Sequence, residues 1–224
     1  MAIDVETKDC TALTDGELAE LGDICTDGPA QFDIGLLSKQ REEWVLITQA
    51  RSGDGLQGFS FCTLERIGGT PSVLVGLASV RRSPDREEVL RAVMGDQLRR
   101  AVLAFPDEDV LIGTRLVDPA GFDAFASYLQ LHDIVPRPGH KATGEERAWG
   151  RRLAKRFGVD ADYHDRQFVA RGDGSPPCVL DYERLDPGTV DADVRALFDD
   201  VDASRGDCLI AFGWAMAEDL AALD

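Results

Sequence analysis

The stretch VLVGLASVRRSPDREEVLRAVMGDQLRRAVLAF, residues 73–105, decides the fold. Its first eight residues are mostly apolar, which is consistent with a central strand that is buried on both faces. After a polar turn, apolar residues recur at helical spacing from Leu90 to Phe105 and predict a long helix over about 84–105. A second apolar run, Val110 to Val117, predicts the next strand. A strand, a long helix and another strand indicate an α/β or α+β protein with one central sheet.

The residues before this stretch add one strand, two helices and two more strands. Thr14 and Glu17 form a capping box, which predicts a helix that begins at this point. The other elements expected here are a first strand within 2–13, a helix over about 30–42, and strands at 44–48 and 58–64 joined by a Gly/Asp-rich turn.

The residues after it predict mainly helices. The elements expected are a short helix from Asp118-Pro119, a basic helix at 144–157, a hairpin of 167–170 with 178–182, and an amphipathic helix within 190–201. Residues 208–223 are apolar and fit a strand or a helix. We therefore divide the chain into one domain at 1–184 and an acidic, helical C-terminal extension at 185–224.

Charge and cysteine content narrow the class of protein. The 224 residues carry a net charge of −17, which repels phosphate, argues against nonspecific binding to nucleic acid or to an anionic membrane, and permits basic partners. Five cysteines without a CxxC pair indicate neither a zinc site nor a disulfide framework. Without a visible signal peptide or an apolar run long enough to span a bilayer, we expect a cytoplasmic protein.

The element order resembles the GNAT acyltransferase superfamily. Two helices, an antiparallel meander, and a strand that leads through a polar turn into a long helix are followed by another strand and helix. The resemblance covers about residues 2–130, with 165–182 as possible closing strands. It implies a GNAT-like α/β fold, a mixed central sheet flanked by helices, and an acetyl-coenzyme A-dependent N-acyltransferase.

The turn after the buried strand is the first segment that carries this resemblance. In the superfamily it reads Arg/Gln-x-x-Gly-x-Gly/Ala and binds the coenzyme A pyrophosphate through backbone amides at the helix start. Here Asp85 and Glu87 replace the small residues, and Pro84 removes an amide donor. A capped helix without a ligand is the alternative interpretation. By resemblance, the cofactor-binding residues are Val80, Arg81, Arg82, Ser83 and Arg86.

The segment from Asp118 to Phe125 resembles the Asn-x-x-Ala-x-x-Leu-Tyr stretch, whose tyrosine often protonates the departing thiolate. Phe125 occupies that position and has no proton to give, so Tyr128, three residues on, is the candidate acid, with packing as the alternative. Glu65 is the candidate general base, with a solvated surface residue as the alternative. His132, His140 and His164 lack metal-ligand spacing, and no metal site is expected.

One charge contrast stands out. Residues 137–156 hold seven bases and two acids, whereas 181–224 hold twelve acids and three bases. The basic helix could dock on the acidic tail of its own chain or of a partner. Alternatively, it could bind the phosphates of a coenzyme or an anionic substrate.

These patterns lead to one function and one alternative. We expect an acetyl-coenzyme A-dependent N-acyltransferase that acts on a small-molecule or protein amine, without nucleic acid or membrane partners and with a homodimer possible. The alternative is a GNAT-fold protein that has lost acyl transfer and serves in binding or assembly, which the missing glycines and tyrosine favour.

Overall fold

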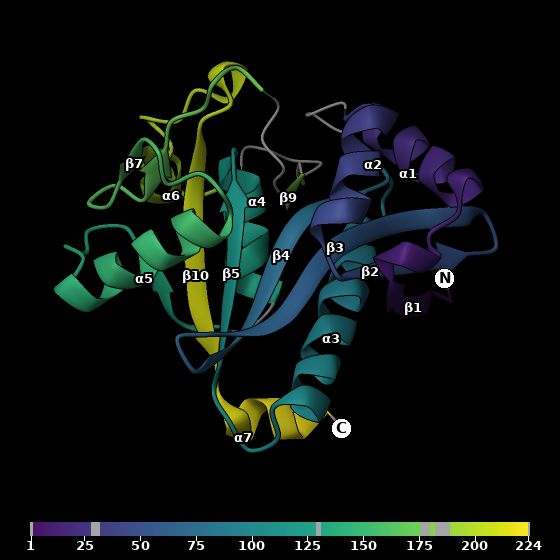
Figure 1. Cartoon of the computed structure of the whole chain (residues 1–224), viewed down its shortest axis with the longest axis horizontal. Helices are drawn as coiled ribbons and strands as arrows, with labels where there is room; N and C mark the ends of the chain where they lie inside the picture. Colours follow the sequence, from purple (N-terminus) through teal and green to yellow (C-terminus); the bar gives the residue numbers. More distant parts are fainter. Residues whose placement is uncertain (1, 28–31, 129–130, 176–179, 182–188, 224) are drawn as a thin grey trace.

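Within residues 2–27, 32–128, 131–175, 180–181 and 189–223, which the computed structural model describes, ten strands form one mixed sheet (Figure 1). They are β1 (Asp4–Asp9), β2 (Leu46–Ser52), β3 (Gly55–Ile67), β4 (Thr70–Val80), β5 (Val110–Leu116), β6 (His132–Val135), β7 (Tyr163–His164), β8 (Val169–Ala170), β9 (Leu180–Asp181) and β10 (Cys208–Ala215). The order across the sheet is β1-β2-β3-β4-β5-β10-β8-β7, with β6 on β10 and β9 on β4.

Helices cover both faces of this sheet. They are α1 (Asp15–Asp27), α2 (Ile34–Glu43), α3 (Arg86–Ala104), α4 (Pro119–Tyr128), α5 (Gly144–Arg156), α6 (Ala192–Ala196) and α7 (Ala217–Leu220), with short 3-10 turns at Cys10–Ala12, Ala203–Arg205 and Ala221–Leu223. In Figure 1, α5 crosses in front of β10, and α4 lies behind β4 and β5. The predicted mixed central sheet flanked by helices is confirmed.

Three glycines show which helices lie against which face. A Cβ at Gly58 would lie 2.7 Å from Val89 of α3, whereas a Cβ at Gly113 would lie 3.1 Å from Leu153 of α5. On the α5 face, a Cβ at Gly76 would lie 2.4 Å from the Trp44 ring at the end of α2. α3 therefore covers one face of the sheet, and α2 and α5 cover the other.

The parallel strands β4 and β5 stay together only briefly. Residues Ser72–Leu74 of β4 pair with Leu111–Gly113 of β5, and beyond these residues the two strands diverge. The antiparallel β3–β4 pairing changes register between Ser60 and Cys62, a bulge that bends β4 as it leaves β5. β9 pairs in parallel with Ala78 and Ser79 and also contacts β5, so it lies in the opening.

The C-terminal residues differ from the prediction of a helical extension. Cys208–Ala215 forms β10, an inner strand that pairs antiparallel with β5 along its whole length, so part of 185–224 completes the central sheet. The predicted hairpin is also wrong, because Val169–Ala170 pairs with β7 and β10, while Leu180–Asp181 pairs with β4. Residues 178–179 and 182 of that hairpin lie outside the described part. The helix expected within 190–201 is short, at Ala192–Ala196.

Local signals in the N-terminal half are confirmed. The Thr14 amide donates to Glu17 Oε2 at 2.9 Å, and the Glu17 amide donates to Thr14 Oγ1 at 3.2 Å, which completes the capping box. The long helix expected over 84–105 is α3 at Arg86–Ala104. No helix in the described residues is long and apolar enough to cross a membrane.

Gly76 allows Trp44 to lie directly on the sheet, and this contact is testable. We expect Gly76→Ala to lower the free energy of unfolding by about 1–3 kcal/mol, because the added methyl group overlaps the indole ring. Urea denaturation would measure it. Gly53→Ala is the control, since a Cβ at Gly53 meets nothing within 4 Å. Equal losses in the two variants would contradict the proposed overlap.

Candidate functional site

The turn at the end of β4 carries the predicted coenzyme-binding residues. Val80 is buried opposite Gly58 of β3. The Arg81 amide donates to the Gln57 carbonyl at 2.7 Å, and Arg81 Nε donates to the Leu56 carbonyl at 3.3 Å. Arg81 is thus fastened to β3, while Arg82 is exposed at the turn.

The start of α3 lacks the side-chain cap that its sequence suggests. Asp85 stands at the N-cap position but makes no side-chain hydrogen bond to the helix amides. Arg86 is buried with 3% of its surface exposed, and Ser83 Oγ is buried without a hydrogen-bond partner among the described residues. The interpretation of a well-capped helix is therefore wrong for Asp85. The Arg86 amide donates to the Ser83 carbonyl at 3.3 Å, and the Asp85 side chain does not cover the amides that follow in the first turn, where an anion can be bound.

A cleft of about 540 Å³ opens on the face of the sheet that α2 and α5 cover. Its floor includes Arg115, two residues beyond the last β4–β5 pair, so the cleft reaches β5 where the two strands have separated. The other lining residues come from α2, from the segment that follows α5, from β8 and β10, and from the loops next to these two strands: Leu36, Lys39, Gln40, Glu43, Phe157, Gly158, Val159, Ala161, Asp162, Ala170, Arg171, Gly172, Asp173, Ser175, Gly206 and Cys208.

Aromatic and amide contacts fix the wall of this cleft. Trp44 Nε1 donates to Gln40 Oε1 at 3.0 Å, and the Trp44 and Phe157 rings lie 6.3 Å apart. The Arg115 guanidinium lies 4.9 Å from the centre of the Phe157 ring and is 8% exposed, a cation–π contact. A positive charge is thereby held beside the opening.

A buried carboxylate holds the two loops at the other side of the cleft. Asp207 accepts hydrogen bonds from Arg171 Nη1 at 2.7 Å and from the Gly172 amide at 2.9 Å, and it is fully buried. Burial by itself would raise the pKa of Asp207. The hydrogen bonds from Gly172, Arg171 and the Asp202 amide outweigh burial and hold this pKa below its usual value.

The structure does not bring Glu65 to the opening. Glu65 pairs in register with Ser72, eight residues before Val80, which is roughly 25 Å along the strand at about 3.3 Å per residue. Its Oε1 accepts a hydrogen bond from Arg156 Nε at 2.6 Å, an ion pair between β3 and α5. In the structure Glu65 anchors the basic helix to the sheet.

For Tyr128, the structure describes the backbone alone. It is the last residue of α4, and its side chain lies outside the described part. Phe125, at the position where the resemblance expects an acid, is 2% exposed in the core. α4 thus packs through Phe125 and carries Tyr128 at its end.

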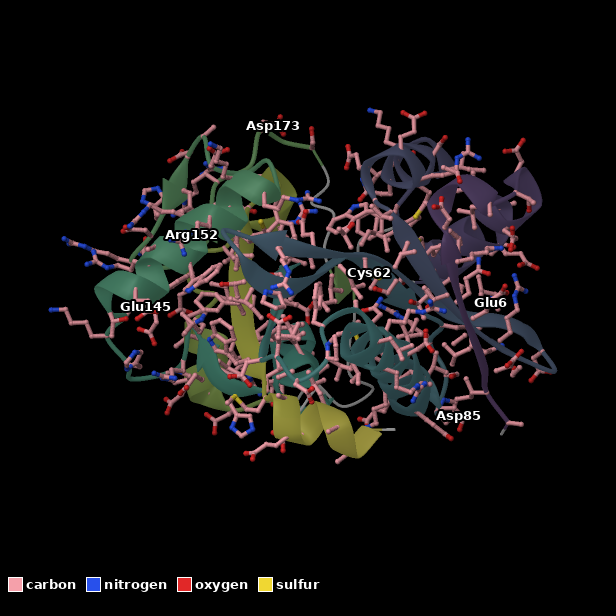
Figure 2. All side chains as sticks on the ribbon, turned by 60° about the horizontal axis from the view of Figure 1, so that its bottom comes forward. Glu6, Cys62, Asp85, Glu145, Arg152 and Asp173 are labelled. Atoms are coloured by element: carbon pink, nitrogen blue, oxygen red, sulfur yellow. The ribbon has the colours of Figure 1, made fainter. Side chains whose placement is uncertain are left out.

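The bases of α5 do not meet the acidic tail in the described residues. Arg156 binds Glu65, Arg151 binds Asp165, and Arg152 stacks on Trp149 at 4.6 Å. The acids of the tail instead bind Arg171, Gln167 and His132. Figure 2 shows Arg152 and Glu145 on the opposite side of the molecule from Asp85, so α5 does not flank the coenzyme turn.

Sequence analysis missed the cleft, although two signals pointed to it. Arg115 is a charged residue within the apolar strand Val110–Leu116, and Trp44 follows the second predicted helix directly. The position of β9 had no local signal. No group of three His, Cys, Asp or Glu side chains among the described residues could hold a metal ion.

Asp207→Asn tests the loop anchor. We expect it to lower the free energy of unfolding at pH 7 by about 1–3 kcal/mol, because hydrogen bonds to a buried carboxylate are lost. The folded pKa of Asp207 is depressed, so its contribution is present above the unfolded pKa of about 3.9 and is lost as pH falls through the folded pKa. Denaturation curves of both proteins between pH 7 and strong acid should therefore converge. A difference that is constant with pH would contradict this.

Comparison with known proteins gives distant likenesses only. No family model and no curated protein matches the chain. Similar solved structures include the ribosomal-protein-S18-alanine N-acetyltransferase from Escherichia coli, at 10% identity and a TM-score of 0.49 over 95% of each chain. An acetyltransferase from Bacillus subtilis in complex with CoA has 12% identity and a TM-score of 0.47, covering 96% of this chain and 100% of that chain.

The IAA acetyltransferase from Bacillus cereus has 8% identity and a TM-score of 0.46, over 96% of this chain and 100% of that chain. At these identities and scores, no activity, acceptor or cofactor carries over to this chain. The fold follows from the chain's own topology: two helices, the β2–β3–β4 meander, β4 leading into α3, and a parallel β5 that diverges from β4. The chain therefore has the GNAT-like α/β fold that its element order predicts.

Proposed function

We propose that this chain is an N-acyltransferase that takes its acyl group from acetyl-coenzyme A. The observation that carries the proposal is the opening between β4 and β5, which begins after Leu74 and Gly113. The cleft above Arg115 reaches the same opening from the α2 and α5 face. Donor and amine acceptor would thus approach each other from two directions.

Backbone groups of β4 would hold the donor. In this arrangement an amine attacks the thioester carbon, and amides of the central strand polarise the carbonyl as negative charge develops on its oxygen. Ala78 and Ser79 are the β4 residues that face the opening, and β9 pairs with them. The donor would therefore have to displace β9 from this edge.

The turn 81–86 would hold the phosphates of the donor. First-turn amides of α3 without a side-chain cap, the Ser83 hydroxyl and the guanidinium of Arg82 are all groups that donate to phosphate oxygens. Arg81 and Arg86 add positive charge at the same turn. The positive charges of the three arginines offset the negative charges of Asp85 and Glu87, which by themselves would repel an anion.

Two residues are proposed for proton transfer. Tyr128 at the end of α4 would protonate the departing thiolate. A carboxylate in the cleft could accept the proton of the amine, and Glu43 lines the cleft. Glu65 of β3 lies beside Ser72, where β4 is still paired with β5. We therefore propose that Glu43 accepts the proton of the amine, and that Glu65 acts only through its ion pair with α5.

Acetyl-coenzyme A should stabilise the protein if it binds. At a ligand concentration one hundred times Kd the gain is about 2.7 kcal/mol, which is a rise in Tm of roughly 5–10 °C for a chain of this size. Arg82→Ala should weaken binding, measured as a smaller rise in Tm with ligand relative to the same variant without ligand. Arg99→Ala, an exposed arginine further along α3, is the matched control. A Tm that stays flat at millimolar acetyl-coenzyme A would remove the proposal for the chain as it stands.

One observation favours a second function, that of a binding or assembly protein without acyl transfer. β9 already satisfies the edge of β4 that a donor would use, and Pro84 and Asp85 make the turn less suitable for a pyrophosphate. In such a protein the opening would serve as a fixed part of the fold.

Leu180→Pro distinguishes the two functions. Proline removes the amide of residue 180 and should weaken the β9–β4 pairing, whereas Leu180→Ala keeps that amide and is the control. For an acyltransferase we expect tighter acetyl-coenzyme A binding in Leu180→Pro than in Leu180→Ala by isothermal titration calorimetry. Absence of binding in the wild type and in both variants would favour the binding or assembly protein.

A further inference from the structure

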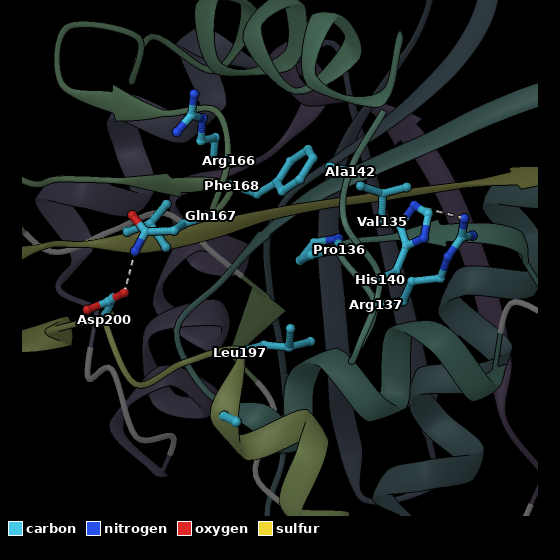
Figure 3. A pocket seen from close by; sticks show the side chains of 12 residues that line it. Val135, Pro136, Arg137, His140, Ala142, Arg166, Gln167, Phe168, Leu197 and Asp200 are labelled. Carbon is cyan, nitrogen blue, oxygen red and sulfur yellow. Dashed lines mark hydrogen bonds between the residues drawn. The ribbon is translucent and has the colours of Figure 1, made fainter. Parts of the chain in front are cut away.

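A small hollow lies between β6, β8 and α6, away from the candidate active site (Figure 3). Its volume is about 170 Å³. Seven of its twelve lining residues are apolar, and the other five are polar or charged: Val135, Pro136, Ala142, Phe168, Val169, Ala196 and Leu197, then Arg137, His140, Arg166, Gln167 and Asp200. It shares no lining residue with the cleft above Arg115.

The outer side of this hollow is cationic. A second hollow of about 350 Å³ shares His140, Ala142 and Arg166 with the first and adds Lys141 and Arg147. Because the two have three lining residues in common, they adjoin. The pair forms one site, in which apolar side chains line part of the inner hollow and cationic side chains gather at the outer one.

In the part of the chain that the structure describes, the carboxylates near these positive charges form their ion pairs with Arg137 and His140 instead. Within the described residues, Lys141, Arg147 and Arg166 make no ion pair. Two carboxylates lie close to the site and bond to residues that line it: Glu146 accepts from Arg137 at 3.1 Å and contacts His140 at 2.9 Å, and Asp200, which itself lines the inner hollow, accepts from the neutral amide of Gln167 at 2.5 Å. Glu146 also accepts from the Thr143 amide at 2.6 Å, which completes the capping box of α5.

Three unpaired cations around one hollow are unusual in a chain with a net charge of −17, because the surrounding acids are available to pair with them. Lysine and arginine donate to carboxylate and phosphate oxygens, and arginine can do so with two parallel bonds. The inner hollow is close to the roughly 150 Å³ of an apolar cavity that holds benzene.

We propose that this site binds a small oxyanion on an apolar body of about one ring, that is, an aryl carboxylate or an aryl phosphate. The ring would occupy the hollow between Phe168 and Leu197. The oxyanion would lie at the mouth between Arg166, Lys141 and Arg147. The site is independent of acyl transfer, since neither the opening nor the turn 81–86 contributes to it.

Four probes test the site by isothermal titration calorimetry and by ¹⁵N-labelled amide shifts: phenyl phosphate, benzoate, phenol and inorganic phosphate. We expect phenyl phosphate or benzoate to bind and to shift the amides of 137–147 and 166–169. The stronger of the two identifies the oxyanion. Phenol and inorganic phosphate should each bind at least tenfold more weakly, since each has only one half of the ligand.

Arg166→Gln should weaken the better probe about tenfold, because one charge-assisted contact is lost. Lys155→Gln removes the same charge from an exposed position on α5 outside the hollow and should leave the affinity unchanged. Ala196→Phe, at an exposed lining position, should block the hollow and abolish binding. Failure of both anions to bind at millimolar concentration would overturn the proposal. Equal affinity for inorganic phosphate, or equal losses in Arg166→Gln and Lys155→Gln, would overturn it as well.

Discussion

The separation of β4 from β5 is the constraint on which the rest of the structure depends. Buried backbone amides and carbonyls must find partners, so two strands that diverge need new neighbours along the edges that they expose. β9 supplies them to β4 at Ala78 and Ser79, while β10 pairs with the opposite edge of β5 over its whole length. The cleft above Arg115 lies on the face of the sheet beside this opening, next to α2 and the segment that follows α5.

Elements with a strong local signal could be predicted from the sequence. The helical spacing from Leu90 onward gave α3 within two residues at each end, and Thr14 with Glu17 marked the start of α1. Pairing between distant segments has no such signal. The apolar run at 208–223 fits a strand or a helix by itself, and only β5 decides that its first half is β10. For the same reason, β9 was expected beside 167–170.

The candidate site was predictable where it follows the fold and unpredictable where it depends on side chains from several elements. The turn 81–86 lies where the element order puts it. Glu65 was chosen because it ends a predicted strand, but register places it beside Ser72, and Arg156 holds it there. The charge of the basic helix suggests docking on an acidic segment or an anion, whereas its position is set by Leu153 against Gly113 and by that ion pair. The cationic hollow uses Lys141 before this helix, Arg147 within it and Arg166 after it.

The place of β10 in the sheet also affects how the chain can assemble during synthesis. About ninety residues separate the end of β5 from the start of β10, and a ribosome needs roughly 5–20 s to add them. Until then, β5 presents an unpaired, apolar edge that can recruit a strand from another molecule. Newly made chains would need protection over this interval, and the nascent protein would be most prone to aggregate just before its last strand arrives.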